Sequence, residues 1–127
     1  MEPDLVVGPV PGKGRGVVAG RSFRRYELVA SASVVVLSAS DWAAIEDTVL
    51  GQYCFRWGED GSERAVALST ASFFNHSFDP NTCPKLLLDE LRINFLAMRD
   101  IDDGEELTFN YNGRPSDGSP LWFTAED

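Results

Sequence analysis

Two polar segments constrain the fold of this chain more strongly than any other feature of its sequence. They are Phe73–Asn81, with the sequence FFNHSFDPN, and Gly104–Tyr111, with the sequence GEELTFNY. Each could be a surface turn by itself, because Asn, Asp, Gly and Pro favour turns. However, two large aromatic residues directly precede Asn75, and such residues are usually buried. We therefore expect the first segment to be a shaped part of the interior.

A third segment, Gly14–Ala19 (GRGVVA), lies near the N-terminus. Two glycines around one residue let the backbone approach another group closely, because no side chain intervenes. The spacing is not that of a dinucleotide-binding or phosphate-binding loop. Alone, this segment predicts a tight turn that leads into a strand.

The composition indicates one folded domain. The chain has 127 residues, of which 43% are hydrophobic and 11% aromatic, which is enough for a core and argues against disorder. Two cysteines, Cys54 and Cys83, are too few for a disulfide framework or a zinc site with paired cysteines. They indicate a reducing compartment, so a cytoplasmic location is expected. The N-terminus has no secretory signal pattern, and the longest apolar run, 34–37, is too short to span a membrane.

The chain carries 20 acidic and 11 basic residues, which gives a formal net charge of -9. This sign opposes binding to a phosphate backbone, so no direct contact with nucleic acid is expected. A basic protein or peptide is the partner that the charge favours. From charge alone, however, solubility is the preferred explanation of an acidic composition.

Short apolar and β-branched runs between Gly, Pro and Asp turns predict a fold that is mainly β, with one or two short helices. For the main helix, Ser40 is a candidate N-cap, Trp42, Ile45 and Val49 follow at helical spacing, and Gly51 is a natural stop. The expected strands are 5–7, 15–19, 28–37, 53–57, 64–68, 85–88 and 91–98, and a helical turn is expected at 69–74.

The three segments, in this order, resemble the motifs of the SET-domain protein lysine methyltransferases. The resemblance covers residues 13–111 of a single domain, 1–127, and leaves 112–127 as a C-terminal tail. It implies small curved sheets around a pseudo-knot, in which the C-terminal segment threads beneath a loop of preceding chain. The cysteine-rich modules that flank many members are absent from this sequence, which is therefore most similar to the minimal microbial or viral form.

The resemblance also implies a methyl donor, S-adenosyl-L-methionine, and no metal. The glycine-containing segment would hold the amino-acid end of the donor, the Asn-His pair would contact its adenine, and an aromatic residue of the tail would form a lid. The donor-binding residues implied in this way are Lys13, Gly14, Arg15, Gly16, Asn75, His76 and Trp122. From the residues alone, a turn with solvated charges remains open for the first four.

In this family a tyrosine at the end of the C-terminal motif orients the lysine amine, and Tyr111 stands at that position. The only histidine, His76, would then contact the donor and pack, and would not act as a general base. In this family, the residue at the position of Phe109 influences how many methyl groups the product carries. Alternation along a strand also predicts that Phe109 lies in the core. Tyr53 and Tyr26 are further candidates for the lysine channel.

Three positions depart from the family's pattern. Asn110 stands where Asp is more common, Ser72 where Arg is usual, and Tyr26 where Gly usually precedes Glu27. The last departure puts the turn at that point in doubt. The segment between Leu37 and Leu68 is short, so a homodimer could complete the substrate side.

The sequence leaves three candidate functions. The leading hypothesis is a lysine methyltransferase that acts on a basic protein or peptide. A SET-like module that binds a peptide or the donor without turnover is the first alternative. A structural or regulatory β-domain with chance motifs is the second.

Overall fold

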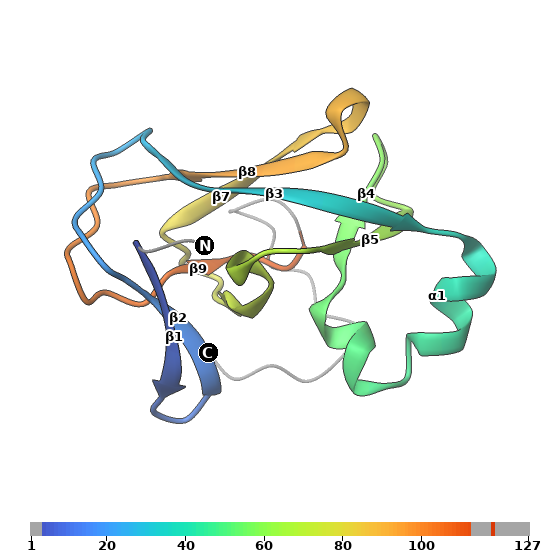
Figure 1. Ribbon diagram of the computed structural model, residues 1–127, viewed down its shortest axis with the longest axis horizontal. Helices are drawn as coiled ribbons and strands as arrows, with labels where there is room; N and C mark the ends of the chain where they lie inside the picture. Colours follow the sequence, from blue (N-terminus) through green and yellow to red (C-terminus); the bar gives the residue numbers. More distant parts are fainter. Residues whose placement is uncertain (1–3, 113–117, 119–127) are drawn as a thin grey trace.

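The computed structural model describes residues 4–112 and residue 118 (Figure 1). Figure 1 shows a β-hairpin at the lower left, a sheet across the top and the helix α1, Ala39–Ile45, at the right. The expectation of a mainly β fold is confirmed. Within the described residues, no helix is long and apolar enough to cross a membrane.

The N-terminal hairpin pairs β1, Leu5–Val10, with β2, Gly14–Ala19, in an antiparallel register that sets Gly8 opposite Gly16. We expected β1 to end before Pro9, but it continues to Val10. Within the part of the chain that the structure describes, β1 pairs only with β2, so it is an edge strand there, where a missing N–H is tolerated.

The central sheet has the order β4-β5-β3-β8-β7. Its longest strand is β3, Leu28–Leu37, which has the predicted bounds. The first half of β3 pairs with β8, Arg92–Ala97, and the second half pairs with β5, Glu63–Ala67. The edges are β4, Phe55–Trp57, and β7, Thr82–Leu87. The 3-10 helix η3, Leu88–Glu90, closes the hairpin of β7 and β8.

The helix α1 is shorter than predicted. Its N-cap is Ser38 and not Ser40, because Ser38 and Asp41 form a reciprocal capping box. At the other end, the Thr48 hydroxyl donates to the Ile45 carbonyl at 2.6 Å. The chain then turns into the 3-10 helix η1, Val49–Tyr53, so Gly51 lies beyond the helix that it was expected to stop.

The two motif segments lie side by side. A 3-10 helix, η2, Thr70–Phe73, leads into β6, Asn75–His76, which pairs in parallel with β9, Thr108–Phe109. On the other side of this C-terminal segment, Leu107 N donates to Val17 O and Ala19 N donates to Glu105 O, both at 2.8 Å. The segment therefore passes between β2 and β6, which agrees with the expected SET arrangement.

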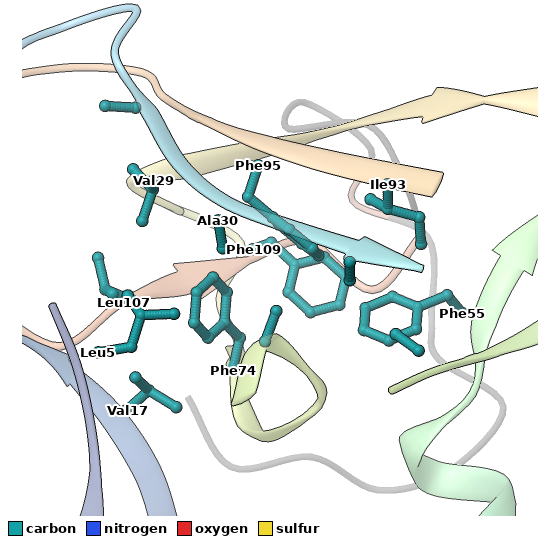
Figure 2. Close-up of a cluster of buried hydrophobic side chains, with 14 of the residues drawn as sticks. Leu5, Val17, Val29, Ala30, Phe55, Phe74, Ile93, Phe95, Leu107 and Phe109 are labelled. Carbon is teal, nitrogen blue, oxygen red and sulfur yellow. The ribbon is translucent and has the colours of Figure 1, made fainter. Parts of the chain in front are cut away.

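The core lies between the hairpin, the central sheet and β9. Figure 2 shows how the rings of Phe55, Phe74, Phe95 and Phe109 gather beneath β3 and β8. Phe95 packs edge-on against Phe74 and Phe109 at ring distances of 5.1 and 5.5 Å. Aromatic side chains from three strands and from the residue that links η2 to β6 thus hold the motif segments against the sheet.

The turn before β3 keeps its special conformation without glycine. Tyr26 has a φ of 72°, and its N–H donates to Ala97 O at 2.8 Å. The left-handed region costs a non-glycine residue about 1–2 kcal/mol. The bond to β8 is made in this conformation, so the departure from the family's glycine does not remove the turn.

Candidate functional site

Glycine is present at the two positions of the N-terminal motif for different structural reasons. Gly14 has a φ of +69°, and a Cβ built there would meet no other atom within 4 Å. Gly16 is buried, and a Cβ there would lie 2.5 Å from Asn75 Nδ2 and 2.7 Å from Val10 Cγ2. Because Gly16 has no side chain, the Asn75 side chain can approach the backbone at this point. The sequence alone had suggested that a glycine here would admit another group such as a ligand. The open side of the loop is at Gly14.

A charged cluster joins the three motifs. Lys13 Nζ pairs with Glu106 Oε1 at 3.1 Å, and Asn75 Nδ2 donates to Glu106 Oε2 at 2.8 Å. The same Nδ2 also donates to the carbonyl of Arg15 at 3.2 Å. The sequence analysis selected Lys13 and Asn75 but not Glu106, because no local pattern distinguishes it from Glu105.

His76 supports Tyr111. The imidazole is 2% exposed, its Nδ1 accepts from the Tyr111 N–H at 3.0 Å, and the two rings lie 5.2 Å apart in an edge contact. An imidazole nitrogen that accepts a hydrogen bond carries no proton, so His76 is neutral with its proton on Nε2. His76 thus packs directly against Tyr111, and its expected contact with the donor stays a prediction.

The Tyr111 hydroxyl points into the domain and donates to the Phe74 carbonyl at 2.6 Å. Burial, and to a smaller degree the charges of Tyr53 and Glu106, raises the pKa of the Tyr111 phenol well above its ordinary range. The phenol is therefore protonated at neutral pH. Asn110, just before it, accepts from Asn112 N at 2.9 Å, so Asn here forms the turn that an Asp could also form.

Tyr53, Phe109 and Tyr111 line one small pocket, which opens to solvent. The Phe109 ring lies 4.7 Å from that of Tyr111 and stacks on Phe55 at 5.3 Å. Its two predicted roles, core and channel wall, are thus both compatible with its place. The full lining is Gln52, Tyr53, Cys54, Phe55, Ser72, Phe74, Phe109 and Tyr111.

One candidate for the lysine channel does not join this pocket. Tyr26 is 71% exposed, lies under the guanidinium of Arg25 at 4.8 Å and is not among the lining residues. Trp122 falls outside the described residues. Cys54, which the sequence did not single out, is one wall of the pocket, and burial raises the pKa of its thiol. A neutral thiol suits a wall better than a nucleophile.

Asn81 is a buried residue that sequence reasoning assigned only to a turn. Its Nδ2 donates to Glu106 O at 2.7 Å and to Glu105 Oε2 at 3.0 Å, and its Oδ1 accepts from Thr108 N at 2.9 Å. One amide side chain therefore fixes the segment that leads to Tyr111. The Asp-Pro-Asn sequence is a turn, but its Asn points inward.

The residues around Gly14 fit the amino-acid end of S-adenosyl-L-methionine, which carries both an ammonium and a carboxylate. Lys13 supplies a positive charge, Glu106 a negative one, and Arg15 O is a backbone acceptor. The Asn75 amide faces this cluster, and its expected contact with the adenine stays a prediction.

Comparison with known sequences agrees with this arrangement. Residues 14–112 match the SET-domain family. The chain is 32% identical over 115 residues to histone-lysine N-methyltransferase Set8 of Drosophila melanogaster, covering 81% of this chain and 17% of that protein. A stretch of 51 residues is 41% identical to histone-lysine N-methyltransferase EZH2 of Chaetomium thermophilum, covering 39% of this chain and 3% of that protein. The chain thus spans a small part of these relatives.

Solved structures share the fold. A humanized mutant of the Polycomb Repressive Complex 2 of Chaetomium thermophilum, bound to the inhibitor GSK126, superimposes with a TM-score of 0.73 at 26% identity, covering 91% of this chain and 16% of that one. A proposed histone methyltransferase of Plasmodium falciparum gives 0.65 at 17% identity, covering 87% and 95% of the two chains. Sequence match, fold and the meeting of the three motifs agree, and the chain belongs to the SET-domain family.

Proposed function

We propose that this chain is an S-adenosyl-L-methionine-dependent protein lysine N-methyltransferase that acts on a basic protein or peptide. One observation carries the proposal: Tyr53, Phe109 and Tyr111 line a single pocket, and the motif that ends in Tyr111 also supplies Glu106 to the charged cluster beside Gly14. The names of the Set8 and EZH2 relatives support the reaction class. The formal charge of -9 supports a basic substrate.

The donor supplies an electrophilic methyl group on a sulfonium. The residues of the chain have to deliver a neutral lysine amine to it, although a free lysine has a pKa of about 10.4. Phe55, Phe74 and Phe109 give the pocket apolar walls, which disfavour the charged ammonium. Tyr111 is protonated and its O–H already serves the Phe74 carbonyl, so its oxygen can accept from the amine. Catalysis is then mainly orientation, and the protein needs no nucleophile of its own.

The test is transfer of a labelled methyl group to a mixture of basic proteins. Tyr111→Phe should lower turnover by about 100-fold or more, by analogy with the loss of one preorganised polar contact, while affinity for S-adenosylhomocysteine is unchanged. His76 still accepts from the backbone N–H at 111 in this variant, so the local fold is kept. Unchanged turnover at saturating substrate would remove Tyr111 from the reaction.

A binding module without turnover is the alternative. It predicts that the parent protein binds S-adenosylhomocysteine or a basic peptide but transfers no label to any substrate offered. The position of Tyr111 in the pocket, at the end of the motif that supplies the reacting tyrosine in the family, favours the enzyme.

A further inference from the structure

Lys13 and Glu106 form a close ion pair between opposite ends of the chain. Their charged atoms lie 3.1 Å apart, and their side chains are only 18% and 20% exposed. Such a pair contributes little to stability, because the desolvation of both groups offsets their attraction. This partly buried pair lies at the open side of a glycine loop. We therefore treat it as a candidate binding site and not as a stabilising contact.

The carboxylate of Glu106 is held in place on its other side. Oε2 accepts from Asn75 Nδ2, and a Cβ on Gly16 would lie 3.0 Å from the same oxygen. The backbone of Glu106 bridges to Val18 of β2. The neighbouring Glu105 turns the opposite way, toward Asn81 and Arg99. Of these two adjacent glutamates, only Glu106 faces the glycine loop.

We propose that Glu106 binds the ammonium group of the amino-acid end of the methyl donor, while Lys13 binds its carboxylate. This assignment rests on the proposed use of S-adenosyl-L-methionine. An α-amino acid carries both charges on one carbon, so it can enter between Lys13 and Glu106 and replace one ion pair by two. Each new contact is a charge-assisted hydrogen bond.

The surroundings suit this exchange. An ammonium has three donors and no acceptor, and Arg15 O can take one that Glu106 leaves. Among the described residues, no atom lies within 4 Å of a Cβ built on Gly14, so they leave the adjoining space open. Glu106 is thereby a selectivity residue: it distinguishes ligands with a complete amino-acid end from adenosine derivatives that lack the amino group.

The test pairs variants with ligand analogues in calorimetry. Glu106→Gln keeps an acceptor for Asn75 but removes the charge, so it should bind S-adenosylhomocysteine at least tenfold more weakly than the parent does. It should bind the analogue without the amino group as well as the parent does. Lys13→Met should show the reciprocal pattern, with a loss for S-adenosylhomocysteine and none for the analogue without the carboxylate. Such ligand-dependent losses isolate the pairwise contact.

Asp103→Asn is the matched control, because Asp103 is exposed and this variant removes one negative charge from the same segment. It should bind S-adenosylhomocysteine as the parent does. If Glu106→Gln loses equal affinity for S-adenosylhomocysteine and for the analogue without the amino group, Glu106 only holds its neighbours in place, and the assignment is overturned. An unchanged affinity for both ligands would overturn it as well. If Glu106→Gln does not fold, the parent protein alone provides the test. It must bind the analogue without the amino group at least tenfold more weakly than it binds S-adenosylhomocysteine. A parent that binds none of the ligands contradicts the proposed function itself.

Discussion

Gly8 and Gly16 face each other across the β1–β2 hairpin, yet only one of them has room for a methyl group. A Cβ on Gly16 would lie 2.5 Å from Asn75 Nδ2, whereas a Cβ on Gly8 would meet nothing within 4 Å. Gly16→Ala should therefore force Asn75 away from Glu106, with a loss of about 1–3 kcal/mol in unfolding free energy and weaker binding of S-adenosylhomocysteine. Gly8→Ala should change neither. Urea unfolding and calorimetry measure both, and equal behaviour of the two variants would refute the role given to Gly16.

Phe109 is the residue at which product specificity can be tested. Its ring is 5% exposed, contacts Phe55 and Tyr111 and lines the pocket. Phenylalanine leaves out a hydroxyl that would retain a water and reduce the space for a methylated amine. The parent is expected to form di- or trimethyllysine, and Phe109→Tyr should shift the product toward monomethyllysine. Mass spectrometry of a saturated peptide decides this, and a parent that stops after one methyl group contradicts it.

Among the elements, those with a local pattern were predictable. The bounds of β3 follow from a continuous apolar and β-branched run. By contrast, β6 and β9 have two residues each, too few for any periodicity, and their parallel pairing joins positions 33 residues apart in sequence, from Asn75 to Thr108. The family resemblance supplied the meeting of these segments, but it did not supply Glu106 or Asn81. Their roles depend on which way each side chain turns in the folded chain.

The clamp formed by Asn81 is the element-scale feature that we expect to matter most for stability. Asn81→Ala removes the acceptor of Thr108 N and both bonds to residues 105 and 106. Since each buried group left unsatisfied costs about 1–3 kcal/mol, the unfolding free energy should fall by roughly 2 kcal/mol or more. Turnover should fall as well, because Tyr111 follows directly on this segment.

The matched control is Asn94→Ala. Asn94 is half-buried on β8 and accepts a single hydrogen bond, from the Ser31 hydroxyl at 2.6 Å. Its loss should cost only about 0.5–1.5 kcal/mol and leave turnover unchanged. Equal effects of the two variants in urea unfolding and in the methyl-transfer assay would mean that Asn81 has no special part in fixing the C-terminal segment.

At the scale of the whole molecule, the site is assembled from three parts of the chain that are remote in sequence. Residues 13–16 come from the hairpin, 75–81 follow η2, and 104–111 pass between them. No single part forms the site, because each contact joins two of them. Lys13 pairs with Glu106, Asn75 donates to Arg15 O, and the Tyr111 N–H donates to His76. Donor affinity and global stability should therefore respond together to changes in these contacts. Tyr111→Phe loses the bond to Phe74 O, which should cost about 1 kcal/mol of unfolding free energy, but its main effect should be on turnover and not on donor affinity.

The last prediction concerns the C-terminal tail, whose Leu121-Trp122-Phe123 lies outside the described residues. Three consecutive large apolar side chains after a stretch rich in Gly and Pro are expected to bury against something. If Trp122 closes the donor site, it excludes water and strengthens the electrostatic contacts of Lys13 and Glu106. Truncation before Leu121 should then weaken S-adenosylhomocysteine binding and turnover more than stability, with an unchanged mass in solution. A dimer that becomes a monomer would instead assign these residues to a subunit interface, and full activity at unchanged mass would contradict both roles.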